Sequence, residues 1–210
     1  MTKHSKEESS STGNSAVHNI PMRQVNSREI VLDMLLEILE EGKFSHTVLN
    51  QTLNKYQHLE KQERAFISRL CIGTVKRYLT LDYRINTVAS LPVKKMKPLI
   101  RNLLRLSAYQ IMYMDQIPVS AVCNEAVKLA KKRGFAKLSG FVNAVLRSII
   151  RTNAGFTLPD KEEDPAYYLE IAYSVPSWLV KEMLEQYPYD QVERMFSASL
   201  EEKKTSIRCN

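Results

Sequence analysis

Residues 99–151 read LIRNLLRLSAYQIMYMDQIPVSAVCNEAVKLAKKRGFAKLSGFVNAVLRSIIR and contain three amphipathic segments in succession. In each segment apolar residues recur at the i, i+3/i+4, i+7 spacing of a helix with one buried face. Pro118 opens the second segment, at a position where a helix does not need the missing N–H. Gly134 follows its last periodic residue, as a left-handed helix terminator does. The stretch therefore predicts three consecutive α-helices.

Two amides interrupt the apolar faces of the second and third segments. Asn124 and Asn143 occupy matching places, and a buried amide is costly unless its hydrogen bonds are satisfied. We therefore interpret both as structural pins between helices rather than as ligand-binding residues.

The preceding residues predict four more helices and no strand, because nothing in them alternates with period two. The first begins at Arg28 behind a Ser27 cap and is ended by Gly42, and Ser45 can cap the second. Gly73 falls inside the third, where glycine costs about 1 kcal/mol relative to alanine, so it predicts a close approach of another helix. The four helices are expected from Arg28 to Gly42, over 45–56, over 65–79 and over about 82–90.

Composition narrows the class of protein. The 210 residues are 44% hydrophobic, which is enough for one or two domains with a core. There is no run of eighteen uncharged apolar residues, and the polar N-terminus lacks the apolar core of a secretory signal, so we expect neither a membrane span nor export. Three scattered cysteines and four isolated histidines favour no zinc site or disulfide framework and fit a reducing cytoplasm. Cys71 and Cys123 are predicted to be small core residues, and we find no P-loop and no nucleophile–base set.

Charge is distributed unevenly along the chain. Residues 28–151 hold 21 Lys/Arg against 10 Asp/Glu, a net charge of +11, whereas residues 152–210 hold 6 against 11, a net charge of −5. A globular segment of +11 indicates a polyanionic partner, although a basic surface without a partner is the alternative.

These residues resemble a known family. NEAVKLAK at 124–131, FVNAVLR at 141–147 and the run at 59–85 are similar to the NusB-type RNA-binding domain, and more narrowly to its version at the N-terminus of RsmB-type (Sun/Fmu) ribosomal RNA cytosine-C5 methyltransferases. YSVPSWLVKEMLEQYP at 173–188 resembles the helical connector of those enzymes, with Trp178 expected inward.

The resemblance implies an all-α fold: a NusB-like bundle followed by a small helical connector, without the catalytic Rossmann-like domain. We expect a disordered tail over 1–22, the RNA-binding domain over 23–151 and a linker over 152–164. Residues 165–210 are expected to form the connector, with a helix over about 191–200, and the first strand leading into the methyltransferase domain, matched by Arg208 and Asn210.

The implied function is to bind small-subunit ribosomal RNA and position it for an S-adenosylmethionine-dependent methyltransferase. No cofactor, metal or catalytic residue is expected in this chain, which should be inactive alone, and its partners would be ribosomal RNA and its own C-terminal methyltransferase domain. Two alternatives stay open: a free-standing NusB-type antitermination factor, and a helical protein-interaction module. About sixty residues beyond the FVNAVL helix disfavour the antitermination factor.

Ten basic residues are the predicted RNA contacts. Arg101 and Arg105 repeat at i, i+4, which predicts a basic stripe on one helical face. The resemblance points to the start of the first helix and to the Leu81-Asp82 turn. The cluster at 128–133 has a second interpretation, as the favourable cationic end of its helix. The set is Arg28, Lys76, Arg77, Arg84, Arg101, Arg105, Lys128, Lys131, Lys132 and Arg133.

Overall fold

A computed structural model describes residues 26–201, and this part of the chain is all-helical, without a β-strand. The predicted tail over 1–22 and the predicted strand at 208–210 lie outside the described residues. The elements are α1 (Ser27–Leu39), α2 (Ser45–Lys55), α3 (Lys61–Lys76), α4 (Tyr78–Asn86), η1 (Val93–Lys95), α5 (Pro98–Tyr113), α6 (Val119–Lys132), η2 (Ala136–Leu138), α7 (Ser139–Arg151), η3 (Asn153–Gly155), α8 (Pro165–Tyr173), α9 (Ser177–Gln186) and α10 (Tyr189–Leu200).

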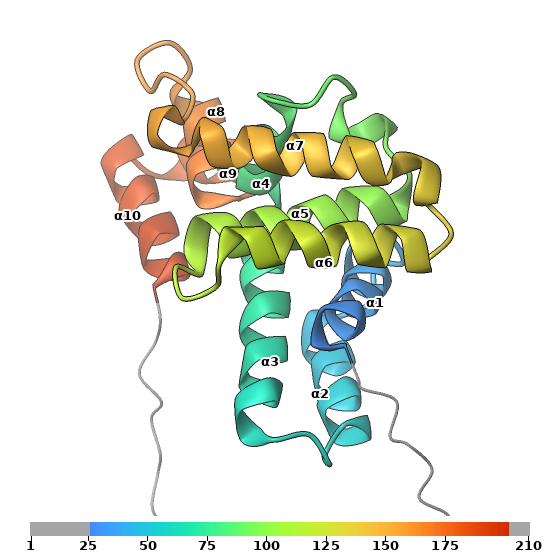
Figure 1. The fold of residues 1–210 in the computed structure, drawn as a ribbon. Helices are drawn as coiled ribbons and strands as arrows, with labels where there is room; N and C mark the ends of the chain where they lie inside the picture. The colour runs from blue at the N-terminus through green and yellow to red at the C-terminus, as the bar shows by residue number, and fades with distance from the viewer. Residues whose placement is uncertain (1–25, 202–210) are drawn as a thin grey trace, which may run out of the picture.

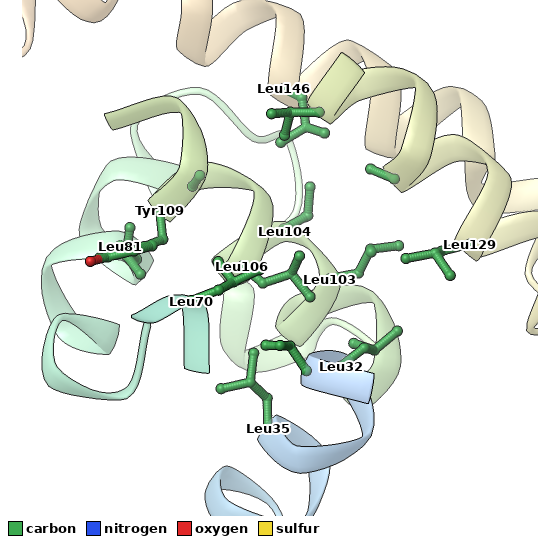
Figure 2. Close-up of a cluster of buried hydrophobic side chains, with 14 of the residues drawn as sticks. Leu32, Leu35, Leu70, Leu81, Leu103, Leu104, Leu106, Tyr109, Leu129 and Leu146 are labelled. Carbon is green, nitrogen blue, oxygen red and sulfur yellow. The ribbon is translucent and has the colours of Figure 1, made fainter. Parts of the chain in front are cut away.

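Helix α5 is the centre of the fold. It contacts α1, α3, α4, α6 and α7, and Figure 1 shows α5, α6 and α7 crossing the molecule above α1, α2 and α3. Its residues are therefore buried on almost every side, including the polar Ser107 and Gln110. In Figure 2, Leu103 lies opposite Leu129 of α6, and Leu104 points toward Leu146 of α7.

The segments predicted from periodicity are present, and their turn residues behave as expected. Gly42 and Gly134 follow α1 and α6 with positive φ angles of 74° and 86°, the left-handed backbone that favours glycine. Pro118 is the N-cap of α6 rather than its first residue. The cap of α1 is Asn26, not Ser27, and Ser45 is the first residue of α2 and forms no side-chain cap.

The boundary between α3 and α4 differs from the prediction. The chain breaks at Arg77, so the helix expected to reach residue 79 ends at Lys76 and the next begins at Tyr78. No Gly or Pro marks this break, so the local sequence carries no stop signal.

Gly73 permits the close approach that its position predicts. A Cβ placed on it would lie 2.1 Å from the ring of Tyr109 on α5. Tyr109 itself is buried and packs against Tyr113 with 5.3 Å between ring centroids. The missing side chain therefore determines how closely α3 and α5 pack.

The prediction of two buried amide pins was wrong. Asn124 is exposed, and Asn143 is half-buried, with its Oδ1 accepting a hydrogen bond from Arg147 Nε at 3.3 Å. Both lie toward the outer side of the α6–α7 pair, because the apolar faces of these helices are filled by residues one position away. Cys71 and Cys123 are buried, as predicted. Burial raises the pKa of the Cys71 thiol to about 12.

The C-terminal helices α8, α9 and α10 form a second, smaller hydrophobic cluster around Leu169, Val180 and Phe196. Helix α8, which we did not predict, begins where Asp164 Oδ1 accepts a hydrogen bond from Tyr167 N at 2.9 Å and Pro165 fills the first helical position. Trp178, expected to point inward, is 68% exposed.

Helices α4 and α8 cap each other. The N–H of Leu79, in the first turn of α4, donates to Ser174 Oγ at 2.9 Å. In return, Thr80 Oγ1 donates at 2.6 Å to the carbonyl of Ile171, in the last turn of α8. Helix ends leave these groups without intrahelical partners, so the pair of bonds joins the C-terminal helices to the larger bundle.

None of the helices between residues 26 and 201 has the length and apolar character needed to cross a membrane.

Candidate nucleic-acid interface

The first turn of α1 places Arg28 at the surface. Asn26 Oδ1 accepts hydrogen bonds from the N–H groups of Arg28 and Glu29 at 3.0 and 3.2 Å, which fixes the start of the helix. The Arg28 guanidinium donates to Gln110 Oε1 at 2.8 Å and lies 5.3 Å from the ring centre of Phe66. Partial burial lowers the pKa of Arg28, and the nearby Glu125 carboxylate opposes this shift. The hydrogen bond to Gln110 thereby fixes one edge of the Arg28 guanidinium, and the group remains positively charged.

Helix α6 runs close to this end of α1. Glu125 accepts hydrogen bonds from Asn26 Nδ2 at 3.1 Å and from Lys128 Nζ at 2.9 Å. The hydrogen bond from Lys128, aided by that from Asn26 and by the charges of Lys128 and Arg28, lowers the pKa of Glu125. Glu125 thus connects Arg28 to the basic end of α6.

Three further basic residues of α6 and its cap complete the surface. Lys132 is paired with Glu29, and Arg133 bonds Asp33 at 2.6 Å, so two of the cations hold α6 against α1. Lys131 is exposed and has no carboxylate partner among residues 26–201. We call this surface the α1–α6 face; its basic residues are Arg28, Lys128, Lys131, Lys132 and Arg133.

A hollow of about 600 Å³ lies at one end of the α1–α6 face. Its walls include the Phe66 ring, the Arg28 guanidinium, the amides of Asn26 and Gln62, and the carboxylates of Glu63 and Glu125. Aromatic and guanidinium planes stack on unpaired bases, while amide and carboxylate groups bond base edges. The hollow therefore has the chemistry of a site for an unstacked nucleotide.

The predicted stripe of Arg101 and Arg105 does not lie on this face. Arg105 is only 8% exposed, and its guanidinium makes two hydrogen bonds of 2.7 Å to the Asp82 carboxylate. Arg101 is paired with Glu40, the residue that follows α1. Arg101 and Arg105 share one helix face, but that face points at Glu40 and at Asp82 of α4. Asp82, expected in a turn, is inside α4 and occupied by Arg105.

Arg84 is also removed from the candidate surface. It is 2% exposed and donates hydrogen bonds of 2.8 Å to the carbonyl of Ile149 and to Thr152 Oγ1, at the end of α7. Phe156 covers it, with its ring centre 4.7 Å from the guanidinium carbon. Burial lowers the pKa of Arg84. Its role is to hold α4 and α7 together.

Lys76 and Arg77 lie at the end of α3, apart from the α1–α6 face. Lys76 is exposed, and Arg77 lies over the ring of Tyr113 at 4.5 Å. Arg77 also lines a small pocket with Tyr173 of α8 and Leu200 of α10. Arg77 therefore faces the C-terminal helices, while Lys76 is exposed at the end of α3.

The sequence reasoning missed two groups of exposed basic residues. Lys94 and Lys95 are in η1 and Lys97 follows it, and the run KKMK could have indicated them. Arg147 and Arg151, at i, i+4 on α7, border a groove of about 500 Å³ with Asn124. None of these five has an ion-pair partner within the described part of the chain.

Comparison with known proteins finds one matching family and two kinds of similar protein. Residues 25–151 match the model of the NusB family. "Probable ribosomal RNA small subunit methyltransferase B" of Bacillus subtilis (strain 168) is 35% identical over 189 residues, which are 90% of this chain and 41% of that protein. "Transcription antitermination protein NusB" of Dehalococcoides mccartyi (strain ATCC BAA-2266 / KCTC 15142 / 195) is 36% identical over 138 residues, 65% of this chain and 95% of that protein.

A solved structure titled "Crystal Structure of Antitermination Factors NusB and NusE in complex with dsRNA" has the same fold. The TM-score is 0.55 at 21% identity, over 60% of this chain and 94% of that chain. The chain thus spans less than half the length of its methyltransferase relative and nearly the whole of its antitermination relative.

Proposed function

Because this chain belongs to the NusB family, we propose that residues 28–151 bind RNA through the α1–α6 face. The observation that carries the proposal is the convergence of Arg28 with the basic end of α6 beside a hollow suited to a nucleotide. Lysine and arginine contacts to phosphates fix the register of the RNA, and the hollow would take one unpaired base.

The RNA is proposed to be small-subunit ribosomal RNA, and the chain to be the substrate-positioning part of an S-adenosylmethionine-dependent cytosine-C5 methyltransferase. The similarity to methyltransferase B proteins, which extends through most of this chain, supports this assignment. S-adenosylmethionine would be held by a separate methyltransferase domain. We therefore expect calorimetric titration of this chain with S-adenosylmethionine to give no heat of binding, and micromolar binding would contradict the proposal.

A free-standing antitermination factor is the second candidate. It is favoured by the 36% identity to the NusB protein of D. mccartyi. It leaves α8, α9 and α10 without a role, because the NusB family match ends at residue 151. A helical protein-interaction module without RNA is the third, and it leaves the +11 charge of residues 28–151 unexplained.

The test is a fluorescence anisotropy titration of a ribosomal RNA hairpin with an unpaired loop. The variant carries Arg28→Glu and Lys131→Glu, which reverse the two cations of the α1–α6 face that have no hydrogen bond to a carboxylate. We expect affinity to fall by at least about 10-fold, since each lost phosphate contact reduces counterion release.

The matched control reverses Lys94 and Lys95 in η1. This element packs on α4, and the charge of Lys94 acts on Glu170 of α8 rather than on the α1–α6 face. The total charge change is the same, so a general effect of net charge would weaken both variants equally. Equal loss in the two variants, or unchanged binding in the first, would refute the assignment of the α1–α6 face.

A further inference from the structure

The only tryptophan of the chain is on the surface. Trp178 lies in the first turn of α9 and is 68% exposed, while Val180, two residues later, is buried. Tryptophan has the largest side chain available for apolar contact, and it is enriched among the few residues that dominate protein interfaces. An exposed tryptophan on an ordered helix is therefore a candidate contact for a partner protein.

Trp178 lies in the part of the chain that distinguishes the two kinds of relative. The NusB family match ends at residue 151. The match to the B. subtilis methyltransferase covers 189 of 210 residues, and any contiguous match of that length includes residues 22–189. The exposed tryptophan is thus on an element shared with a relative more than twice as long as this chain.

Charge around Trp178 disfavours RNA as its partner. Residues 165–201, which contain α8, α9 and α10, hold two Lys/Arg and six Asp/Glu, a net charge of −4. On the exposed side of α9, the residues three, four and seven positions after Trp178 are Lys181, Glu182 and Glu185, so acidic groups outnumber the single basic one. Phosphates would be repelled here, whereas a protein surface with an apolar recess and a basic rim would be complementary.

The position of Trp178 relative to the RNA-binding domain is fixed. Helix α8 is tied to α4 by the Ser174–Leu79 and Thr80–Ile171 hydrogen bonds. Helix α9 follows within three residues, after Ser174 in the left-handed conformation. A protein that docks on Trp178 would therefore be held in a defined orientation toward the bound RNA.

We propose that Trp178 is the central contact between α9 and the methyltransferase domain of the full-length enzyme. This inference rests on the proposed function, and it adds a named docking surface to it. The recognised surface would combine an apolar recess for the indole with basic groups for Glu182 and Glu185.

The test uses this chain labelled with 5-fluorotryptophan, which gives one ¹⁹F resonance because there is one tryptophan. The probe is the part of the B. subtilis relative that lies outside the match, accepted as folded if it binds S-adenosylmethionine in calorimetry. We expect the probe to shift or broaden the resonance, and Trp178→Ala to weaken its binding by at least about 10-fold. The matched control is Phe44→Ala on α2, an aromatic residue that is 76% exposed, and it should bind the probe as the parent chain does.

If the probe is insoluble, the same variants are placed in a fusion in which this chain replaces the matching segment of the relative, and the resonance is assigned by its loss in Trp178→Phe. Unchanged probe binding in Trp178→Ala, or an unshifted resonance in the fusion, would overturn the proposal. A resonance that responds to the RNA hairpin instead would make Trp178 a base-stacking residue and would also overturn it. Failure of the RNA-binding proposal is seen separately, as absent hairpin binding by a chain that still binds the probe through Trp178.

Discussion

Glu40 follows the last residue of α1, where a negative charge meets the negative end of the helix dipole. Its carboxylate accepts hydrogen bonds from Arg101 Nε at 2.7 Å and from Asn102 Nδ2 at 2.6 Å, and Arg105 is 3.7 Å away. The Arg101 hydrogen bond is the main cause of a lowered pKa for Glu40. These contacts hold α1 to α5 and compensate for the unfavourable position of the charge.

Stability should therefore depend on the ionisation of Glu40. Because the pKa is lowered in the folded state, the stabilisation is present above the ordinary value of 4.5 and is lost as pH falls through the lower, folded value. We expect Glu40→Gln to have a lower free energy of unfolding than the parent chain at pH 7, and the difference to shrink below about pH 4.5. Urea unfolding at pH 7, 5, 4 and 3 measures this, and a difference that is as large at pH 3 as at pH 7 would contradict it.

Gly73 supports a second prediction at this scale. Gly73→Ala would gain helix propensity of about 1 kcal/mol but drive a methyl group into the Tyr109 ring, at a cost of about 1–3 kcal/mol. We expect net destabilisation in thermal unfolding. Ala at exposed Gly140, which has open space around it in α7, is the control and should be neutral or stabilising. A double-mutant cycle with Tyr109→Leu should show coupling, and additive effects would rule out the clash.

Which arginines are free could not be predicted from local sequence. Arg101 and Arg105 have the i, i+4 spacing of a surface stripe, but their carboxylate partners are 61 and 23 residues away in the chain. Arg84 donates hydrogen bonds to groups 65 and 68 residues away. The positions of Arg28 and of the cluster at 128–133 were identifiable from the sequence, whereas their meeting on one face depended on the packing of α6 against α1.

At the scale of elements, the reciprocal caps of α4 and α8 replace caps that the sequence lacks. Arg77 precedes α4 and provides no side-chain cap, so the cap comes from Ser174, 95 residues away from Leu79. Ser174 adopts a left-handed φ of 56°, which a residue with a Cβ adopts at a cost. At Ser174, the hydrogen bond to Leu79 stabilises the folded state, and the left-handed backbone conformation destabilises it.

Substitution at these caps should separate the two effects. Thr80→Val keeps the shape and removes the bond to the Ile171 carbonyl, so we expect a loss of about 1–3 kcal/mol. Ser174→Gly removes the hydroxyl cap but relieves the strain, so it should cost less than Ser174→Ala, which loses the cap and keeps the strain. Denaturant unfolding ranks the three variants. If Ser174→Gly is the more destabilising change at that position, the strain argument fails.

Helix boundaries were predicted best where glycine or proline marks them, as at Gly42, Pro118 and Gly134. The α3–α4 break at Arg77 and the outward direction of Trp178 were not predicted. The break has no local marker, and the direction of Trp178 depends on which side of α9 packs against α8 and α10.

At the scale of the molecule, the net charges of +11 over residues 28–151 and −4 over residues 165–201 give the chain two chemically different parts. RNA should be attracted to the first and repelled by the second. The α1–α6 face has five cations, three of which are paired with carboxylates. Fewer phosphates should therefore be neutralised than the total charge suggests.

The salt dependence of RNA affinity should reflect the number of cations on the α1–α6 face that contact phosphates. With two to five phosphate contacts at 0.7–0.9 per contact, we expect a log–log slope between about −1.4 and −4.5. Reversing Arg28 and Lys131 should flatten the slope by about 1.4–1.8, whereas reversing Lys94 and Lys95 should leave it unchanged. Anisotropy titrations from 50 to 300 mM salt measure both slopes. Affinity that is insensitive to salt would show that phosphates are not the main contact.

The burial of Arg84 beneath Phe156 bears on where this protein can be divided. The family match stops at residue 151, yet the guanidinium of Arg84 bonds Thr152 and is covered by Phe156. A fragment cut after Arg151 would remove Phe156, which covers the Arg84 guanidinium, and Thr152, which accepts a hydrogen bond from it. Helix α7 would also lose the residues that close its last turn. A cut after residue 160 keeps both contacts. Domain shuffling and protease mapping should therefore find the workable boundary about ten residues beyond the one that sequence similarity marks.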